Sequence, residues 1–299
     1  MPFFFPDTPD LPLPPGHRFP ATKYRLLRER MSAERTLGSA ALAASPLAAI
    51  DDVLRAHDPA YVSAVIEGTL AADAQRRIGI PWSPVLRQRS LATVGGALAS
   101  ARAALRDGIS GQLAGGTHHA HRDFGSGYCV LNDLAVAALV LLDEGAVSRV
   151  SILDCDVHQG DGTAAILARE PRVQTISIHG EKNFPFRKCP SDLDIALADG
   201  TEDLAYLDAL EGALAAVRSF APDLLLYLSG ADALAADRLG RLSLTQAGLY
   251  ERDVRVLDVA RSMRLPVAIA IGGGYAEPID ATIEGYLGTF RAARKVYGL

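Results

Sequence analysis

Two aspartates and a histidine stand at alternate positions of one short segment: Asp154, Asp156 and His158. In an extended chain alternate side chains point to the same side, so these three side chains could bind one metal ion together. Carboxylates with an imidazole suit Zn²⁺, and also Fe²⁺ or Mn²⁺. The alternative is an aspartate-capped helix start with an incidental histidine, which we disfavour because burying unpaired carboxylates is costly. Asp232, in a Ser-Gly-Ala-Asp turn, is the best third ligand, although it could instead cap a helix.

A histidine pair, His118-His119, follows the glycines Gly115-Gly116. Most such pairs are ordinary core or surface residues. Here, however, Asp154 and Asp161 remain once the metal ligands are assigned, and a carboxylate bonded to a histidine fixes its tautomer and raises its basicity. The segment therefore predicts two His–Asp pairs.

Tyr275 follows three consecutive glycines, 272–274. Such a turn could cradle a phosphate, but neither a lysine nor a Gly-x-x-Gly follows it. A phenol held there could instead donate a hydrogen bond to an oxyanion that develops during a reaction.

These residues come directly after apolar, β-branched runs that predict strands. The expected strands are 112–114, 149–154, 173–178, 223–228 and 266–271. The expected helices are 131–143, with Asn132 as N-cap, 162–168, 204–220 and 245–263. This alternation predicts βαβ units and a parallel sheet covered on both faces. Ligands bind beyond the carboxyl ends of such strands, where the candidate residues stand.

The composition is that of an ordinary globular protein: 299 residues, 49% hydrophobic, with a net charge of −5. We expect one domain over residues 1–299, with an irregular proline-rich segment over 1–20. The mild acidity argues against nucleic-acid binding. The sparse cysteines, the lack of a basic, apolar leader and the short apolar runs favour a cytoplasmic protein without a membrane span.

Several segments, in this order, resemble the zinc-dependent histone deacetylase family from about Gly16 to the C-terminus. They are Gly115-Gly-Thr-His-His-Ala120, Gly127-Tyr-Cys-Val-Leu-Asn-Asp133, Asp154-Cys-Asp-Val-His-Gln-Gly-Asp-Gly162, Ser191-Asp-Leu-Asp-Ile-Ala-Leu-Ala-Asp-Gly200, Ser229-Gly-Ala-Asp232 and Gly272-Gly-Gly-Tyr275. His17-Arg-Phe-Pro20, Lys23-Tyr24 and Asp237-Arg-Leu-Gly-Arg-Leu242 resemble the class IV branch and its bacterial relatives. The resemblance implies a three-layer α/β fold of arginase–deacetylase type with a central parallel sheet.

The resemblance also implies a role for individual residues. Asp156, His158 and Asp232 match the zinc ligands. His119 with Asp161 matches the general base, His118 with Asp154 the companion pair, and Tyr275 the phenol that stabilises the transition state. Asp154, Asp156, His158, Ser177 and Ile178 match a structural potassium site. Gly127, Tyr128, Phe186 and Gly273 match positions that line an acyl-lysine tunnel, with Phe184 as the alternative to Phe186.

Two departures bear on the substrate. Trp82 stands where eukaryotic members carry a rim aspartate that clamps a peptide backbone, and Ala233–Ala236 lack an expected glycine. The implied activity is hydrolysis of N-acyl-lysine in proteins or peptides. Small acylated amines such as acetylpolyamines are the main alternative substrates. A silent acyl-lysine binding module and a ureohydrolase with a second Mn²⁺ are the other readings. Neither the acyl length nor the oligomeric state follows from the sequence.

Overall fold

One parallel sheet of eight strands crosses the computed structural model, which describes all 299 residues. The strands are β1 (Pro2–Phe5), β2 (Ala41–Ala44), β3 (Ile109–Gln112), β4 (Val150–Asp154), β5 (Val173–Gly180), β6 (Leu193–Leu197), β7 (Leu224–Ser229) and β8 (Val267–Ile271). Their order across the sheet is β2-β1-β3-β8-β7-β4-β5-β6. Every pair of neighbours is parallel, so the carboxyl ends of β4, β7 and β8 meet at one edge.

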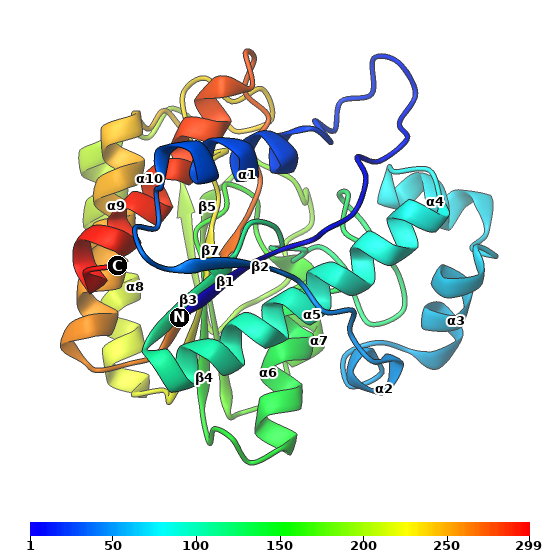
Figure 1. Ribbon diagram of the computed structural model, residues 1–299, viewed down its shortest axis with the longest axis horizontal. Helices are drawn as coiled ribbons and strands as arrows, with labels where there is room; N and C mark the ends of the chain where they lie inside the picture. Colours follow the sequence, from blue (N-terminus) through cyan, green and yellow to red (C-terminus); the bar gives the residue numbers. More distant parts are fainter.

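Ten helices surround the sheet. They are α1 (Lys23–Glu34), α2 (Ile50–Val53), α3 (Pro59–Glu67), α4 (Ala72–Ile78), α5 (Pro84–Asp107), α6 (Asp133–Asp143), α7 (Asp161–Leu167), α8 (Asp203–Phe220), α9 (Gln246–Ser262) and α10 (Asp280–Tyr297). Figure 1 shows α8, α9 and α10 on one face and α5, α6 and α7 on the other, with α2–α4 beyond α5. The expected three-layer arrangement is confirmed.

The strands bury both faces because their residues are apolar throughout. In β7, Leu225 and Tyr227 belong to one core cluster, with α8, α9 and α10. Leu224, Leu226 and Leu228 belong to the second, with α5 and α6. This period of two divides each strand between two cores. Because both faces of the sheet are packed, the residues that follow the carboxyl ends of its strands are held in fixed positions.

Several sequence predictions agree with these elements to within one or two residues. Strands β4, β7 and β8 and the start of β5 lie where apolar runs predict them, as do α7, α8 and α9. Helix α6 begins after Asn132, whose side chain accepts a hydrogen bond from the Ala135 amide at 3.0 Å. The predicted N-cap is confirmed.

Two predictions are wrong. Residues 2–5 form β1, so the irregular segment expected over 1–20 does not include them. Pairing with β2 satisfies their backbone groups. The strand expected over 112–114 instead covers Ile109–Gln112. Its polar residues hide the apolar pattern of a buried strand. Ser110 and Gln112 are both buried, and their side chains donate hydrogen bonds to the carbonyls of Pro2 in β1 and Thr93 in α5.

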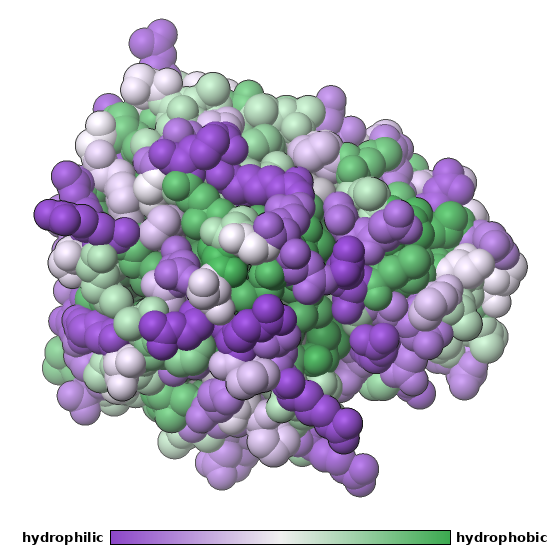
Figure 2. All heavy atoms as spheres, turned by 90° about the horizontal axis from the view of Figure 1, so that it is seen from below, coloured by the Kyte–Doolittle hydropathy of each residue, from purple (hydrophilic) through white to green (hydrophobic).

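The surface shows no extended apolar face in the view from below, where hydrophilic side chains project between smaller apolar patches (Figure 2). None of the helices combines the length and the apolar character that crossing a membrane requires.

Candidate active site

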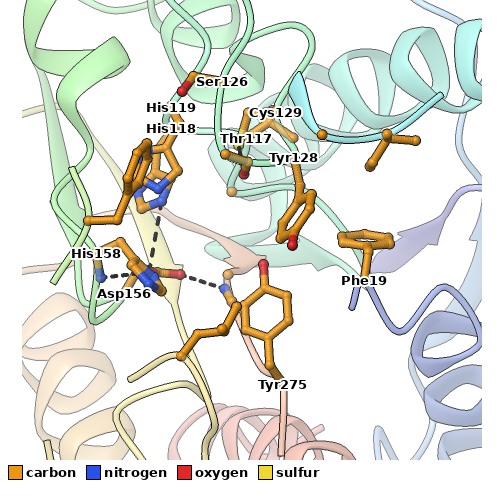
Figure 3. A pocket seen from close by; sticks show the side chains of 18 of the residues that line it. Phe19, Thr117, His118, His119, Ser126, Tyr128, Cys129, Asp156, His158 and Tyr275 are labelled. Atoms are coloured by element: carbon orange, nitrogen blue, oxygen red, sulfur yellow. Dashed lines mark hydrogen bonds and ion pairs between the residues drawn. The ribbon is translucent and has the colours of Figure 1, made fainter. Parts of the chain in front are cut away.

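A cavity of about 730 Å³ opens at the carboxyl ends of the strands. Its walls come from the N-terminal segment, the start of α1, the end of α4, the first half of α5 and the loops that follow β3, β4, β5, β7 and β8. Asp156, His158, His118, His119 and Tyr275 all line it. Residues scattered over more than half of the chain are thus brought to one place (Figure 3).

Asp156, His158 and Asp232 form the one group of three potential metal ligands in the chain, with one donor atom from each within 4.8 Å of the others. His158 Nδ1 lies 2.9 Å from Asp156 Oδ1 and 3.1 Å from Asp232 Oδ2. Ligand atoms bound to a tetrahedral Zn²⁺ lie about 3.3 Å apart, given bonds of 2.0–2.1 Å. The three residues therefore fit a small divalent cation with little movement.

The glycine backbone that follows β8 packs directly against the Asp156, His158 and Asp232 group. The Gly273 amide donates to Asp156 Oδ2 at 2.5 Å. A Cβ at Gly273 would lie 1.8 Å from Asp232 Oδ2 and 2.9 Å from Asp156 Oδ2. Only glycine allows the chain after β8 to approach both carboxylates so closely.

Both predicted His–Asp pairs are present. His118 Nδ1 lies 2.6 Å from Asp154 Oδ2, and His119 Nδ1 lies 2.6 Å from Asp161 Oδ1. The two imidazole rings stand 4.1 Å apart, between centroids. They lie above Asp156 and His158 in Figure 3. Because each Nδ1 is occupied, each Nε2 remains available for proton transfer.

The two imidazoles differ in charge. Burial lowers the pKa of His118, but the Asp154 and Asp156 carboxylates outweigh it and raise the pKa to about 9. Burial and the neighbouring charge of His118 lower the pKa of His119 to about 4, in spite of Asp161. At neutral pH His119 is therefore the unprotonated member, which is the form a general base needs.

Tyr275 is fixed through its backbone, while its hydroxyl stays free. Its amide donates to Asp237 Oδ2 at 2.6 Å, and Lys23 Nζ donates to the preceding carbonyl of Gly274 at 3.2 Å. The phenol oxygen points into the pocket (Figure 3) and has no hydrogen-bond partner within the chain. Burial, together with Tyr24 and the buried aspartates, raises the pKa of Tyr275 well above its usual value, so the phenol is a neutral donor.

Aromatic rings wall the space beside His119. Gly127 has φ 53°, and a Cβ there would lie 2.6 Å from the His119 ring. Tyr128 follows and packs on Phe19 at 5.2 Å and on Tyr275 at 6.0 Å, between ring centroids. The sequence did not single out Phe19, because nothing local connects it with Tyr128.

Both candidate aromatic residues, Phe184 and Phe186, line the cavity. Phe184 packs on His119, with ring centroids 4.9 Å apart, whereas Phe186 is 91% exposed. Trp82 is not among the lining residues. Its indole N–H donates to the backbone carbonyl of Val65 in α3 at 2.8 Å, so this donor is already satisfied within the chain.

The remaining sequence-predicted residues lie close by. Ser177 and Ile178 are in β5, where Ser177 pairs with Asp154 of β4, and both are buried. Ala233–Ala236, whose departure from the family pattern had no explanation, form a short bridge with Leu244. Gly240 makes the close approach there, since a Cβ would lie 1.9 Å from the Asp232 carbonyl.

His121 and Asp133 also belong to the site, although the sequence analysis gave them no role. His121 Nε2 bonds to Asp161 Oδ2 at 3.0 Å, so Asp161 holds two histidines. Asp133 accepts hydrogen bonds from the Gly116 and Thr117 amides and shapes the turn before His118. The position of His121, two residues after His119, could have indicated that it belongs to the site. No local pattern indicated the role of Asp133.

The family model of the histone deacetylase domain matches residues 17–287. The chain therefore belongs to the histone deacetylase family, as the resemblance implied. An uncharacterized protein of Picosynechococcus sp. is 44% identical over 290 residues, which cover 96% of each chain. Histone deacetylase 2 of Arabidopsis thaliana is 28% identical over 269 residues, which cover 87% of this chain and 70% of that protein.

A solved structure supports the fold. The acetylpolyamine aminohydrolase of Burkholderia pseudomallei superposes with a TM-score of 0.78 and 22% identity, and the match covers 99% of both chains. At this level of identity the likeness concerns the three-layer architecture alone.

Proposed function

We propose that this protein is a zinc-dependent amidohydrolase that removes acetyl or other acyl groups from acylated lysine side chains. One observation carries the proposal: a buried Asp-His-Asp group, two His–Asp pairs and an unpartnered phenol line the same cavity. Because the chain belongs to the histone deacetylase family, hydrolysis of an acyl amide is the reaction that we assign to this arrangement.

The chain's own residues have distinct tasks. Neutral His119 accepts the proton of the attacking water through Nε2, while Asp161 holds its Nδ1–H. The Tyr275 hydroxyl donates to the oxygen of the acyl carbonyl as negative charge develops there. The amide C–N bond then breaks, and His119 or His118 delivers a proton to the leaving amine. The products are a carboxylate and a free amine.

Asp156, His158 and Asp232 would hold the metal ion. Zn²⁺ fits this donor set, with Fe²⁺ as the alternative, and when bound it would polarise the carbonyl and acidify the water. We also propose K⁺ as a structural ion near Asp154, Asp156, His158, Ser177 and Ile178, because these residues follow the family pattern and β4 and β5 place them together.

Two of the other readings lose support. A ureohydrolase needs a second group of metal ligands, and the chain has one. A catalytically inactive binding module would be expected to lack a proposed metal ligand, a His–Asp pair or the Tyr275 phenol, and all of these are present. The argument for a small acylated amine rests on the missing rim aspartate. Asp156 is the one acid that lines the cavity, so this alternative substrate class keeps its support.

Metal dependence tests the proposal. Chelation should abolish hydrolysis of an acetyl-lysine peptide, and one equivalent of Zn²⁺ should restore it. Asp232→Asn should lower both the metal content and the activity, whereas Asp258→Asn, at an exposed position of α9 outside the cavity lining, should change neither. Full activity in rigorously metal-free protein would contradict the mechanism.

A further inference from the structure

The cavity carries positive charge although the whole chain is acidic. Of its lining residues seven are lysine or arginine, and the one acid is Asp156, a proposed metal ligand. Lys23 and Arg89 pack on aromatic rings inside, with the Arg89 guanidinium 3.9 Å from the Tyr24 ring centroid. The other five are exposed: Arg18, Arg77, Lys182, Arg238 and Arg241.

Neighbouring acids neutralise only part of this charge. Arg238 pairs with Glu277 at 2.6 Å, and Arg241 pairs with Asp199 at 2.6 Å. Lys182 shares the same Asp199 at 3.9 Å. Three cations thus face two acids.

Arg18 and Arg77 have no carboxylate within 4.0 Å. The Arg77 guanidinium lies 4.7 Å from the Phe124 ring centroid, which leaves its charge uncompensated. Two further acids adjoin these cations in the sequence. Asp237 is turned inward and accepts the Leu239 and Tyr275 amides, and Glu181 is exposed beside Lys182 without an ion pair. Even when Glu181 is counted with Glu277 and Asp199, five exposed cations outnumber three acids.

These cations converge on one opening. They come from four separate segments, namely the N-terminal segment, α4, the loop after β5 and the loop after β7. A cleft lined by charge of one sign concentrates oppositely charged ligands. The opening is also where the amine portion of an acyl-amine substrate must lie when its acyl group reaches the metal ligands.

We propose that the substrate carries negative charge beside its acylated amine, an inference that rests on the proposed function and narrows its substrate class. The shared chemistry is a carboxylate close to the acyl-lysine, whether from acidic residues of a peptide or from a small acylated amino acid. A protonated acetylpolyamine would meet like charges at the opening and is disfavoured.

Matched substrates test the charge preference. The set contains acetyl-lysine peptides of one length flanked by glutamate, glutamine or lysine, free Nε-acetyl-lysine with its α-amino group blocked, the amide of that compound, and N-acetylputrescine. Single exposed ion pairs are worth roughly 1.4–5-fold, so kcat/KM for the glutamate peptide should exceed that for the lysine peptide by about tenfold or more. The ratio should shrink in 0.5 M salt, where the Debye length falls well below 8 Å.

Charge reversal tests the residues. Arg18→Glu combined with Arg77→Glu should lower kcat/KM for the glutamate peptide and raise it for the lysine peptide. The matched control is Arg218→Glu, an exposed arginine in the last turn of α8, at the end of the sheet opposite the cavity. It should leave the ratio unchanged.

The outcomes separate this inference from the proposed function. A preference for the glutamate peptide indicates an acidic protein segment, and a preference confined to the free carboxylate of acetyl-lysine indicates a small substrate. Equal rates for all flanks, or faster cleavage of the lysine peptide or N-acetylputrescine, overturn the inference while leaving the deacylase proposal intact. Calorimetry with the same peptides measures the charge preference in binding even if none of them is cleaved. Equal affinities for the glutamate, glutamine and lysine peptides would also overturn the inference.

Discussion

At the scale of single residues, the phenol of Tyr275 separates a catalyst from a binding module. Tyr275→Phe removes a donor whose contribution is greatest in the transition state. We expect kcat to fall about 10²–10³-fold with little change in the substrate's Kd. Single-turnover kinetics paired with direct binding measures both quantities. Unchanged turnover would show that another group donates to the oxyanion.

The unequal charges of His118 and His119 give a second residue-scale prediction. His119→Ala removes the neutral base and should lower kcat roughly 10²–10⁴-fold. Asp161→Asn leaves the imidazole in place but loses its orientation, and should cost roughly 10–100-fold. Metal analysis should show the ion retained in both variants. Near-normal kcat in the His119→Ala protein would reassign the base.

Sequence alone predicted the Asp156, His158 and Asp232 group, both His–Asp pairs and the position of Tyr275, because most of these residues stand shortly after a strand. It failed where spatial neighbours are distant in sequence. Phe184 and Phe186 are two residues apart, and no local pattern tells which ring turns toward His119. The position of Trp82 outside the cavity lining has the same origin, since its partner Val65 lies 17 residues away in α3.

At the scale of elements, α9 contacts the loops that carry Asp156 and Asp232, two of the proposed metal ligands. Arg252 of α9 is buried and donates to the carbonyls of Cys155 and Gly230, at 3.3 and 2.7 Å. Arg252→Lys loses the forked geometry and should weaken metal affinity by about tenfold while lowering Tm. A metal titration monitored by thermal unfolding measures both. Arg255→Lys, at a half-buried position of the same helix that pairs only with Glu251 and Glu211, is the control and should change neither. An equal effect of the two substitutions would exclude a positioning role for Arg252.

The start of α6 confers sensitivity to acid. His57 is fully buried, and its Nε2 accepts the Asn132 amide at 2.8 Å. Burial lowers the pKa of His57 to about 4, below the unfolded value of 6.5. The unfolded chain therefore binds the proton first, and stability falls as the pH drops from about 6.5 towards 4, by about 1.4 kcal/mol per pH unit at most.

His57→Gln keeps an acceptor for Asn132 and does not titrate. Denaturant unfolding at pH 7 and pH 5 should therefore show a smaller loss of stability in this variant than in the wild type. An unchanged difference between the two pH values would assign the acid sensitivity to other groups.

The elements most accessible from sequence were the central ones. Strands β4, β7 and β8 are apolar throughout because both faces are covered, and this composition is visible in a single sequence. Strand β6 alternates between half-buried and exposed residues at the sheet edge, and β1 lies among prolines. Their identity as strands depends on neighbours that no local window contains.

At the scale of the whole molecule, the two ends of the chain support one another. Phe3 of β1 is fully buried and meets Phe290 of α10 edge to face, with ring centroids 6.0 Å apart. Phe3→Ala should lower the free energy of unfolding by about 3–5 kcal/mol. Denaturant unfolding measures this loss. Leu204→Ala, with a side chain that is 85% exposed, should lie within about 0.5 kcal/mol of the wild type, and a comparably small effect at Phe3 would mean that β1 contributes little.

The dispersal of the metal ligands sets an order of events during biosynthesis. His158 and Asp232 are 74 residues apart, and the Gly273 amide that braces Asp156 emerges from the ribosome later still. In small zinc domains the ion drives folding. Here two hydrophobic cores, of 41 and 37 buried residues, give the fold a source of stability that does not depend on the ion. Under the proposed function, the complete ion site exists only after the chain has been synthesised past Gly273, so we expect the metal to bind late in biosynthesis.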